Sequence, residues 1–173
     1  MAATTESERK RMKNPTTTER KSERELVVTR TCDAPARLVF DAWTKPELFQ
    51  RWWVPKSFPI SMIACEMDVR TGGGYRLVFE MKQDPSKPMP FFGKYVEVTP
   101  PSRLVWTNDE AGEDGPITTV TFEEKAGKTL VVMSELYPSK EALDAELASG
   151  AKSCVGETFD QLDDVLGSSG APG

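Results

Sequence analysis

Apolar and polar residues alternate over most of the chain between residues 62 and 136. Side chains on a strand point to opposite faces in turn, so this period of two indicates strands with one buried and one wet face. Short groups rich in Gly, Pro and Asp separate the alternating segments and predict turns. Six strands are therefore expected, at residues 62–70, 75–81, 91–98, 103–107, 117–123 and 129–136.

Helical signals flank these strands. A β-branched run at residues 25–31 predicts an earlier strand, and two short helices are expected after it, the second ending before Pro55. A last helix is expected from Ser139 to Leu166, with a weak point at Gly150, because a glycine inside a helix costs roughly 1 kcal/mol relative to alanine. The order predicts an α+β helix-grip fold. In it, a curved antiparallel sheet wraps around a long C-terminal helix, and two short helices follow the first strand.

Composition indicates one domain with two polar ends. The chain has 173 residues and 38% hydrophobic content, with no apolar run long enough to cross a membrane. We expect a domain at residues 24–166 and a flexible tail at 167–173. Residues 1–23 are charged, almost without large apolar side chains and without the apolar region of a secretory signal, so we expect them to be disordered and the protein to be cytoplasmic.

The net charge and the residue types present limit the catalytic groups, metal ligands and partners that the sequence predicts. There is no histidine, which removes the usual general base and the commonest transition-metal ligand. The three cysteines, Cys32, Cys65 and Cys154, lie far apart, so neither a disulfide framework nor a zinc site is predicted. We expect no metal and no cofactor. A net charge of −5 disfavours nucleic acid as a partner.

Several short motifs between residues 33 and 73 lie in a recognisable order: Asp33-Ala34-Pro35, Val39-Phe40-Asp41-Ala42-Trp43, Pro46-Glu47, Arg51-Trp52-Trp53-Val54-Pro55 and Asp68-Val69-Arg70-Thr71-Gly72-Gly73. In this order they resemble the family of Hsp90-ATPase-activator-homologue-1-like proteins. That family belongs to the superfamily of Bet v 1-like pollen allergens, START lipid carriers and aromatic polyketide cyclases. The resemblance extends from Arg24 to Leu166. It implies a cavity between the sheet and the last helix that accepts an apolar or aromatic small molecule.

The small and large residues of the last helix suggest where that cavity lies. Ala148 and Ala151 are small, whereas Phe159, Leu162 and Leu166 are large, so space is expected at the alanine end. On residues 129–136 we expect the even-numbered side chains to face inward and Glu135 to face outward. The candidate cavity residues are Trp52, Trp53, Tyr75, Leu77, Phe79, Trp106, Ser134, Ala148, Ala151, Val155, Thr158 and Phe159. Plain core packing is the alternative explanation for these residues.

The charged residues indicate less about ligand binding or catalysis. Asp68, Arg70 and Lys152 are possible polar contacts for a ligand, although Asp68 and Arg70 also fit a solvated sheet face. No spacing identifies catalytic residues, which stay unknown.

Three classes of function remain open. The first is a binding module for a small hydrophobic ligand, with a role in stress response or secondary metabolism. The second is a cyclase, aromatase or hydrolase, whose acid or base would come from Glu66, Asp68, Glu80, Tyr75 or Glu135. The third is a chaperone partner, as the family name suggests. Both a monomer and a homodimer fit the sequence.

Overall fold

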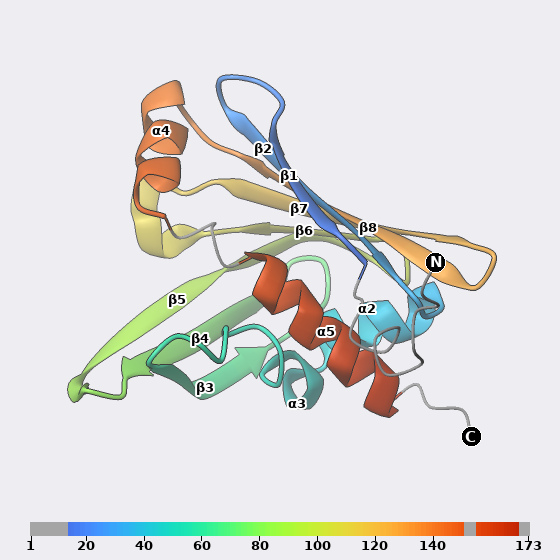
Figure 1. Cartoon of the computed structure of the whole chain (residues 1–173). Coiled ribbons are helices and arrows are strands. Elements are labelled where there is room, and N and C mark those ends of the chain that lie inside the picture. The colour runs from blue at the N-terminus through green and yellow to red at the C-terminus, as the bar shows by residue number, and fades with distance from the viewer. Residues whose placement is uncertain (1–13, 151–154, 170–173) are drawn as a thin grey trace, which may run out of the picture.

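The computed structural model describes residues 14–150 and 155–169, which form an eight-stranded antiparallel sheet with helices on one face (Figure 1). The strand order is β1-β2-β8-β7-β6-β5-β4-β3. All neighbouring strands run antiparallel. The strands are β1 Thr16–Arg20, β2 Glu25–Cys32, β3 Ile60–Met67, β4 Gly74–Met81, β5 Asp84–Thr99, β6 Arg103–Thr107, β7 Ile117–Lys125 and β8 Lys128–Leu136.

The long strand β5 joins the two halves of the sheet. Its first part pairs with β4 and its last part with β6, and a bulge between Tyr95 and Glu97 interrupts the register. A bulge bends its strand and increases the local twist. Figure 1 shows the consequence: the sheet folds over, with β1, β2, β7 and β8 in one half and β3 and β4 in the other. The expected helix-grip fold is confirmed.

Helices occupy the concave side. Two short helices, α2 Ala36–Thr44 and α3 Pro46–Phe49, follow β2, and a 3-10 helix, η1 Asp109–Asp114, follows β6. The last two helices are α4 Lys140–Ala148 and α5 Val155–Ser169. Figure 1 shows α5 crossing between the two halves of the sheet, while α4 lies near the ends of β2 and β6. Of the helices described, none is both long enough and apolar enough to cross a membrane.

Trp43 is the centre of the hydrophobic core. It is 1% exposed, and its ring lies within 4.8 to 6.1 Å of the rings of Trp52, Trp53, Trp106, Phe122 and Phe159. These residues come from the turn after α3, from the sheet and from α5, while Trp43 itself is on α2. Aromatic pairs at such distances contribute beyond the area they bury. The cluster therefore fixes α2 and α5 against the same part of the sheet.

A buried ion pair holds α5 in place. The guanidinium of Arg30, on β2, donates to Asp160 and Asp163 of α5 and to the hydroxyl of Thr16 on β1. The Arg30 side chain is 1% exposed. Burial alone lowers the pKa of Arg30, but the hydrogen bonds and charges of Asp163 and Asp160 outweigh it and raise the pKa. Nothing in the sequence pattern had indicated this contact.

The structure corrects two expectations about the ends of the domain. Residues 16–20, placed in the disordered tail, form β1 and pair with β2 from Thr16 opposite Arg30 to Arg20 opposite Leu26. The last helix is also divided. Gly150 has a φ of 77°, a left-handed conformation that ends α4, and α5 begins at Val155. The tail expectations for residues 1–13 and 170–173 lie outside the described residues.

We predict that Arg30→Met destabilises the protein by about 3 kcal/mol, because the Asp163 carboxylate, whose side chain is only 17% exposed, loses the buried cation that compensates it. Urea unfolding at pH 7 measures the loss. The matched control is Arg70→Met, since Arg70 pairs with Asp68 on the surface, where an ion pair contributes under about 1 kcal/mol. Equal effects of the two substitutions would show that the Arg30 pair does not hold α5.

We also predict that β1 contributes to stability. A deletion of residues 1–22 is compared with a deletion of residues 1–13, so that their difference reports residues 14–22. The longer deletion removes the pairing with β2 and the ion pair between Arg20 and Asp144. We expect a cost of about 1 to 2 kcal/mol, or roughly 2 to 8 °C in melting temperature. Identical melting temperatures would contradict a stabilising strand.

Candidate ligand-binding pocket

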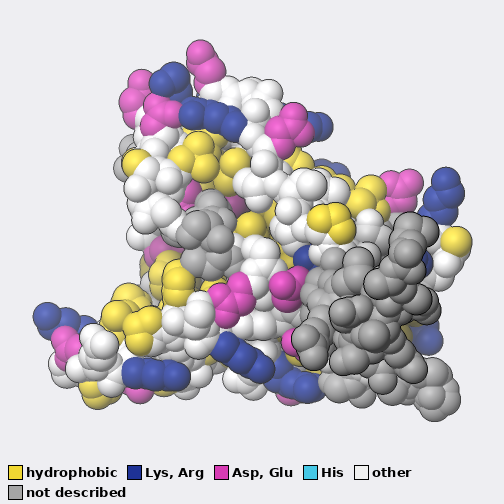
Figure 2. Space-filling model, viewed as in Figure 1, with side chains coloured by type: hydrophobic (Ala, Val, Ile, Leu, Met, Phe, Trp, Pro, Cys, Tyr) yellow, Lys and Arg dark blue, Asp and Glu magenta, His cyan; other side chains and the backbone are white. Residues whose placement is uncertain are grey.

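A pocket of about 690 Å³ lies on the concave side of the sheet. Its walls come from α2, α3, strands β3 to β8, η1 and α4. Figure 2 shows hydrophobic side chains on both sides of the hollow between the α4 end and the β4–β5 end of the molecule. The volume is within the range of pockets that hold drug-sized ligands. One end of the wall is rich in aromatic side chains: Trp43, Phe49, Trp53, Tyr75, Phe79, Phe91, Tyr95 and Trp106.

Tyr75 is held across the sheet by its hydroxyl, which donates to the carbonyl of Thr107 at 2.6 Å. Gly93 lies between these groups, opposite Tyr75 in the β4–β5 register. A Cβ atom at Gly93 would lie 2.1 Å from the Thr107 carbonyl oxygen and 2.9 Å from the Tyr75 hydroxyl. Only glycine therefore allows β4, β5 and β6 to place the Tyr75 ring in the pocket wall.

Asn108 contributes an oriented amide to the pocket. Its Nδ2 donates to the Pro116 carbonyl at 2.8 Å and to the Thr118 hydroxyl at 3.0 Å. This leaves Oδ1 as the acceptor on the side of Tyr75, whose hydroxyl lies 3.5 Å away, at the outer limit of a hydrogen bond. Asn108 therefore adds an acceptor to the wall.

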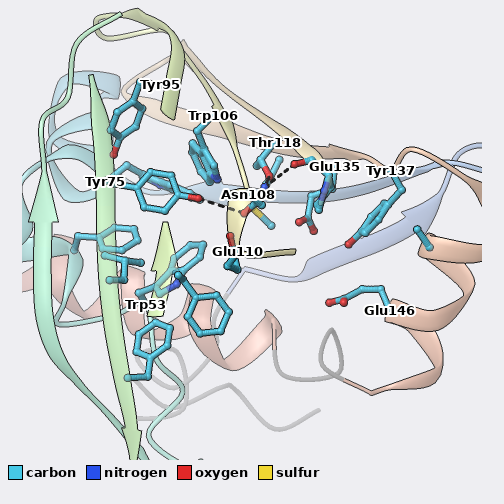
Figure 3. A pocket seen from close by; sticks show the side chains of 18 of the residues that line it. Trp53, Tyr75, Tyr95, Trp106, Asn108, Glu110, Thr118, Glu135, Tyr137 and Glu146 are labelled. Atoms are coloured by element: carbon cyan, nitrogen blue, oxygen red, sulfur yellow. Dashed lines mark hydrogen bonds between the residues drawn. The ribbon is translucent and has the colours of Figure 1, made fainter. Parts of the chain in front are cut away.

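Carboxyl groups gather at the other end of the pocket. Glu135 on β8, which is 7% exposed, Glu110 on η1, and Glu141 and Glu146 on α4 all line it. Figure 3 shows Glu135 and Glu146 near Tyr137, and Glu110 between Glu135 and Tyr75. Among the described residues that line the pocket, none is Lys or Arg. The pocket thus has an aromatic end and an acidic end.

Burial keeps the pocket tyrosines protonated. It raises the pKa of Tyr75 well above the ordinary value, and the charge of Glu110 adds to the rise. Burial likewise raises the pKa of Tyr137, with further contributions from Glu135 and Glu146. It also raises the pKa of Tyr95. At neutral pH these three phenols are hydrogen-bond donors and not nucleophiles.

The described cysteines are not activated nucleophiles. Burial raises the pKa of Cys32 to about 12 and that of Cys65 to about 11, so both stay thiols at neutral pH. Neither lines the pocket. Within residues 14–150 and 155–169, no group of three or more His, Cys, Asp or Glu is placed to hold a metal ion. The described polar groups of the pocket wall are therefore carboxyls, phenols, indoles, hydroxyls and an amide.

Five of the candidate residues from the sequence line the pocket. They come from the second short helix region and from strands β4 and β6, and they are Trp53, Tyr75, Leu77, Phe79 and Trp106. Whether they bind a ligand stays a prediction.

The other candidates lie elsewhere. Trp52 is fully buried in the core, where its indole nitrogen donates to the Ala42 carbonyl at 2.9 Å. Thr158 and Phe159 are buried on α5, and Val155 packs against the core. Ala148 is exposed at the end of α4. None of these five residues lines the pocket.

Two charged candidates form a surface ion pair. Arg70 Nε donates to both carboxylate oxygens of Asp68, at 2.9 and 3.0 Å, and both side chains are exposed. The solvated-face interpretation fits this arrangement. Ala151 and Lys152 lie outside the described residues.

The inward face of β8 was predicted one residue out of register. Ser134 lies on the opposite face, where its hydroxyl donates to Glu25 at 2.6 Å, and Met133 and Glu135 line the pocket instead. The two faces of β8 are almost equally apolar in sequence, so alternation alone could not choose between them. A buried glutamate also contradicts the rule that charges lie on the wet face. The sequence feature that could have indicated the correct face is Tyr137. This large aromatic residue lies on the same face as Met133 and Glu135, and all three line the pocket.

Sequence reasoning also missed the contributions of η1 and α4. Glu110 lies in a loop-like segment without periodicity, and α4 was merged into the last helix. The expected alanine end of that helix therefore does not form the pocket wall in the described residues. Instead, Ala142, Ala145 and Glu146 on α4 line it.

Known proteins share this architecture. A protein from Rhodobacter sphaeroides is 22% identical, with a TM-score of 0.80, and the match covers 90% of this chain and 99% of that chain. A protein from Nitrosomonas europaea is 26% identical, with a TM-score of 0.77 over 88% of this chain and 99% of its own. The AHSA1-like protein from Aeromonas hydrophila is 21% identical, with a TM-score of 0.63 over 83% and 94%.

Sequence comparison agrees with the fold. No curated protein matches the chain significantly. The family model described as "Activator of Hsp90 ATPase homolog 1-like protein" matches residues 33–167, which is well over half of the chain. This protein therefore belongs to the family of Activator of Hsp90 ATPase homolog 1-like proteins.

Proposed function

We propose that this protein binds a small aromatic molecule in the pocket on the concave side of its sheet. The observation that carries the proposal is the pocket itself, about 690 Å³ in volume and with many aromatic rings in its wall. A folded protein normally fills such space with side chains, because packing in protein interiors is dense. Stacking on an incoming aromatic ring would recover contacts that the pocket walls lack.

A buried donor supports this proposal. Trp43 lines the pocket and is 1% exposed, and its indole nitrogen has no hydrogen-bond partner among the described residues. A buried donor without a partner costs about 1 to 3 kcal/mol. An acceptor on a bound molecule would satisfy it. The ligand that fits best is therefore an aromatic molecule with a few polar atoms rather than a plain hydrocarbon.

The other two classes of function have less support. A cyclase or hydrolase needs a defined pair of acid and base, and no geometry among the described residues assigns those two roles. The printed family name refers to activation of an Hsp90 ATPase. No described surface of this chain identifies such a partner, so binding of a small molecule is the function that we propose.

We predict that the neutral probe N-phenyl-1-naphthylamine binds with one site per chain. Three of the four tryptophans, Trp43, Trp53 and Trp106, line the pocket, so light absorbed by them at 295 nm should reach a bound probe. The measurement is sensitised probe emission as a function of concentration. A well-folded protein that gives no saturable sensitised emission would contradict the proposal.

A pair of variants on α4 tests the location. Ala145→Trp should weaken probe binding by about tenfold or more, equivalent to about 1.4 kcal/mol, because Ala145 lines the pocket and the indole would occupy part of it. Ala148→Trp, on the same helix but outside the wall, should leave binding unchanged. Both alanines are exposed, so neither substitution should lower the melting temperature by much. Equal binding by the two variants would place the probe elsewhere.

A further inference from the structure

The last helix, α5, is bonded to a segment of the pocket wall although it does not line the pocket itself. None of residues 155–169 belongs to the wall. Side chains of α5 nevertheless bind the backbone of residues 50–59, which connect α3 to β3 and include Trp53. Because Trp53 lines the pocket, α5 acts on the wall through this connection.

Gln161 makes the connection with both polar atoms of its amide. Its Nε2 donates to the carbonyl of Trp52 at 2.9 Å and to the carbonyl of Val54 at 2.8 Å. Its Oε1 accepts from the backbone N–H of Lys56 at 2.8 Å. The residue is 6% exposed. Only a side-chain amide combines two N–H donors with an acceptor oxygen in one group, so Gln161 matches all three backbone groups at once.

The two carbonyls that Gln161 binds belong to the residues directly before and after Trp53. Holding the backbone on both sides of a residue fixes the direction in which its side chain points. One turn earlier on α5, Glu157 accepts from the backbone N–H and the hydroxyl of Ser57. The helix therefore holds this connection at two places, and the first of them flanks Trp53.

The Trp53 ring depends on that backbone for its place in the wall. Its ring stacks on Phe49, with 4.8 Å between centroids, and lies 5.9 Å from the ring of Trp43. Trp52 is anchored differently, because its ring is fully buried and its indole nitrogen donates to the Ala42 carbonyl. Trp53 is only partly buried, so packing constrains it less than it constrains Trp52.

Resting on the proposed function, we propose that Gln161 is a positioning residue for ligand binding. It acts through Trp53 and does not line the pocket. By holding the backbone on both sides of Trp53, Gln161 sets where the indole lies and how well an aromatic molecule stacks on it. Without these hydrogen bonds, part of the binding energy is spent on ordering the wall, and the affinity falls.

Two substitutions test this role. Gln161→Met keeps the approximate size of the side chain and removes all three hydrogen bonds. Gln161→Glu keeps an acceptor for Lys56 but replaces the donor with an oxygen that repels the two carbonyls. Each should weaken binding of N-phenyl-1-naphthylamine about fivefold or more, measured by sensitised emission at a temperature where the variant is folded. Either variant suffices if the other proves unstable.

Val165→Ala is the matched control. Val165 lies one turn further along α5, is 4% exposed and does not line the pocket. The substitution should lower the melting temperature, because a buried side chain loses two methyl groups, but it should leave the dissociation constant within about twofold. A control that weakens binding as much as Gln161→Met would show that only the general stability of α5 matters.

A second measurement follows Trp53 without any probe. In a two-dimensional ¹⁵N–¹H NMR spectrum, the indole signal of Trp53 is assigned by its absence from Trp53→Phe. Substitution of Gln161 should move or broaden this signal and leave that of Trp106, on β6, in place. Val165→Ala should leave both signals in place.

The outcomes separate the two proposals. If the wild type binds the probe and the Gln161 variants bind it equally well, the pocket binds aromatic molecules and the positioning role is wrong. Weaker binding with an unchanged Trp53 signal overturns that role as well, because the effect would not act through Trp53. If the well-folded wild type binds no probe, both the proposed function and the inference that rests on it fail.

Discussion

The ion pair between Arg30 and the two aspartates of α5 is the contact on which the arrangement of this protein depends. It connects the last helix to β2, and through Thr16 to β1, at one half of the concave face. The aromatic cluster around Trp43 holds the same helix from the other side. Once α5 is fixed there, its large side chains fill that half of the face. The pocket lies over the remaining part of the sheet, with α4 in its wall.

The polar character of the pocket follows from where each element begins and ends. Gly150 ends α4 in a left-handed conformation, so α4 belongs to the pocket wall and not to the long helix. The register of β7 and β8 places Thr118 opposite Glu135 on the inward face. Because β6 continues through Thr107 into η1, Asn108 and Glu110 reach the same space. Local backbone features therefore bring carboxyl groups from three elements to one end of an aromatic cavity.

The strands were easier to predict than the site. Alternation located β4 and β6 almost to the residue, because each has one clearly apolar face. It failed for β8, whose two faces are similarly apolar, and so Glu135 was placed in solvent when it is buried. β1 was missed because five polar residues carry no hydrophobic signal and are stabilised by an edge that only the folded sheet provides. Glu110 had no pattern at all, since contacts distant in sequence place it.

The most direct test of a ligand-binding pocket is the indole region of a two-dimensional ¹⁵N–¹H NMR spectrum during titration with an aromatic molecule. Trp53 and Trp106 line the pocket, while Trp52 lies in the closed core with its indole nitrogen bonded to Ala42, so the protein contains its own reference. Binding in the pocket should move the signals of Trp53 and Trp106 most and that of Trp52 least. A titration that leaves Trp53 and Trp106 unchanged, or moves Trp52 most, would contradict the account.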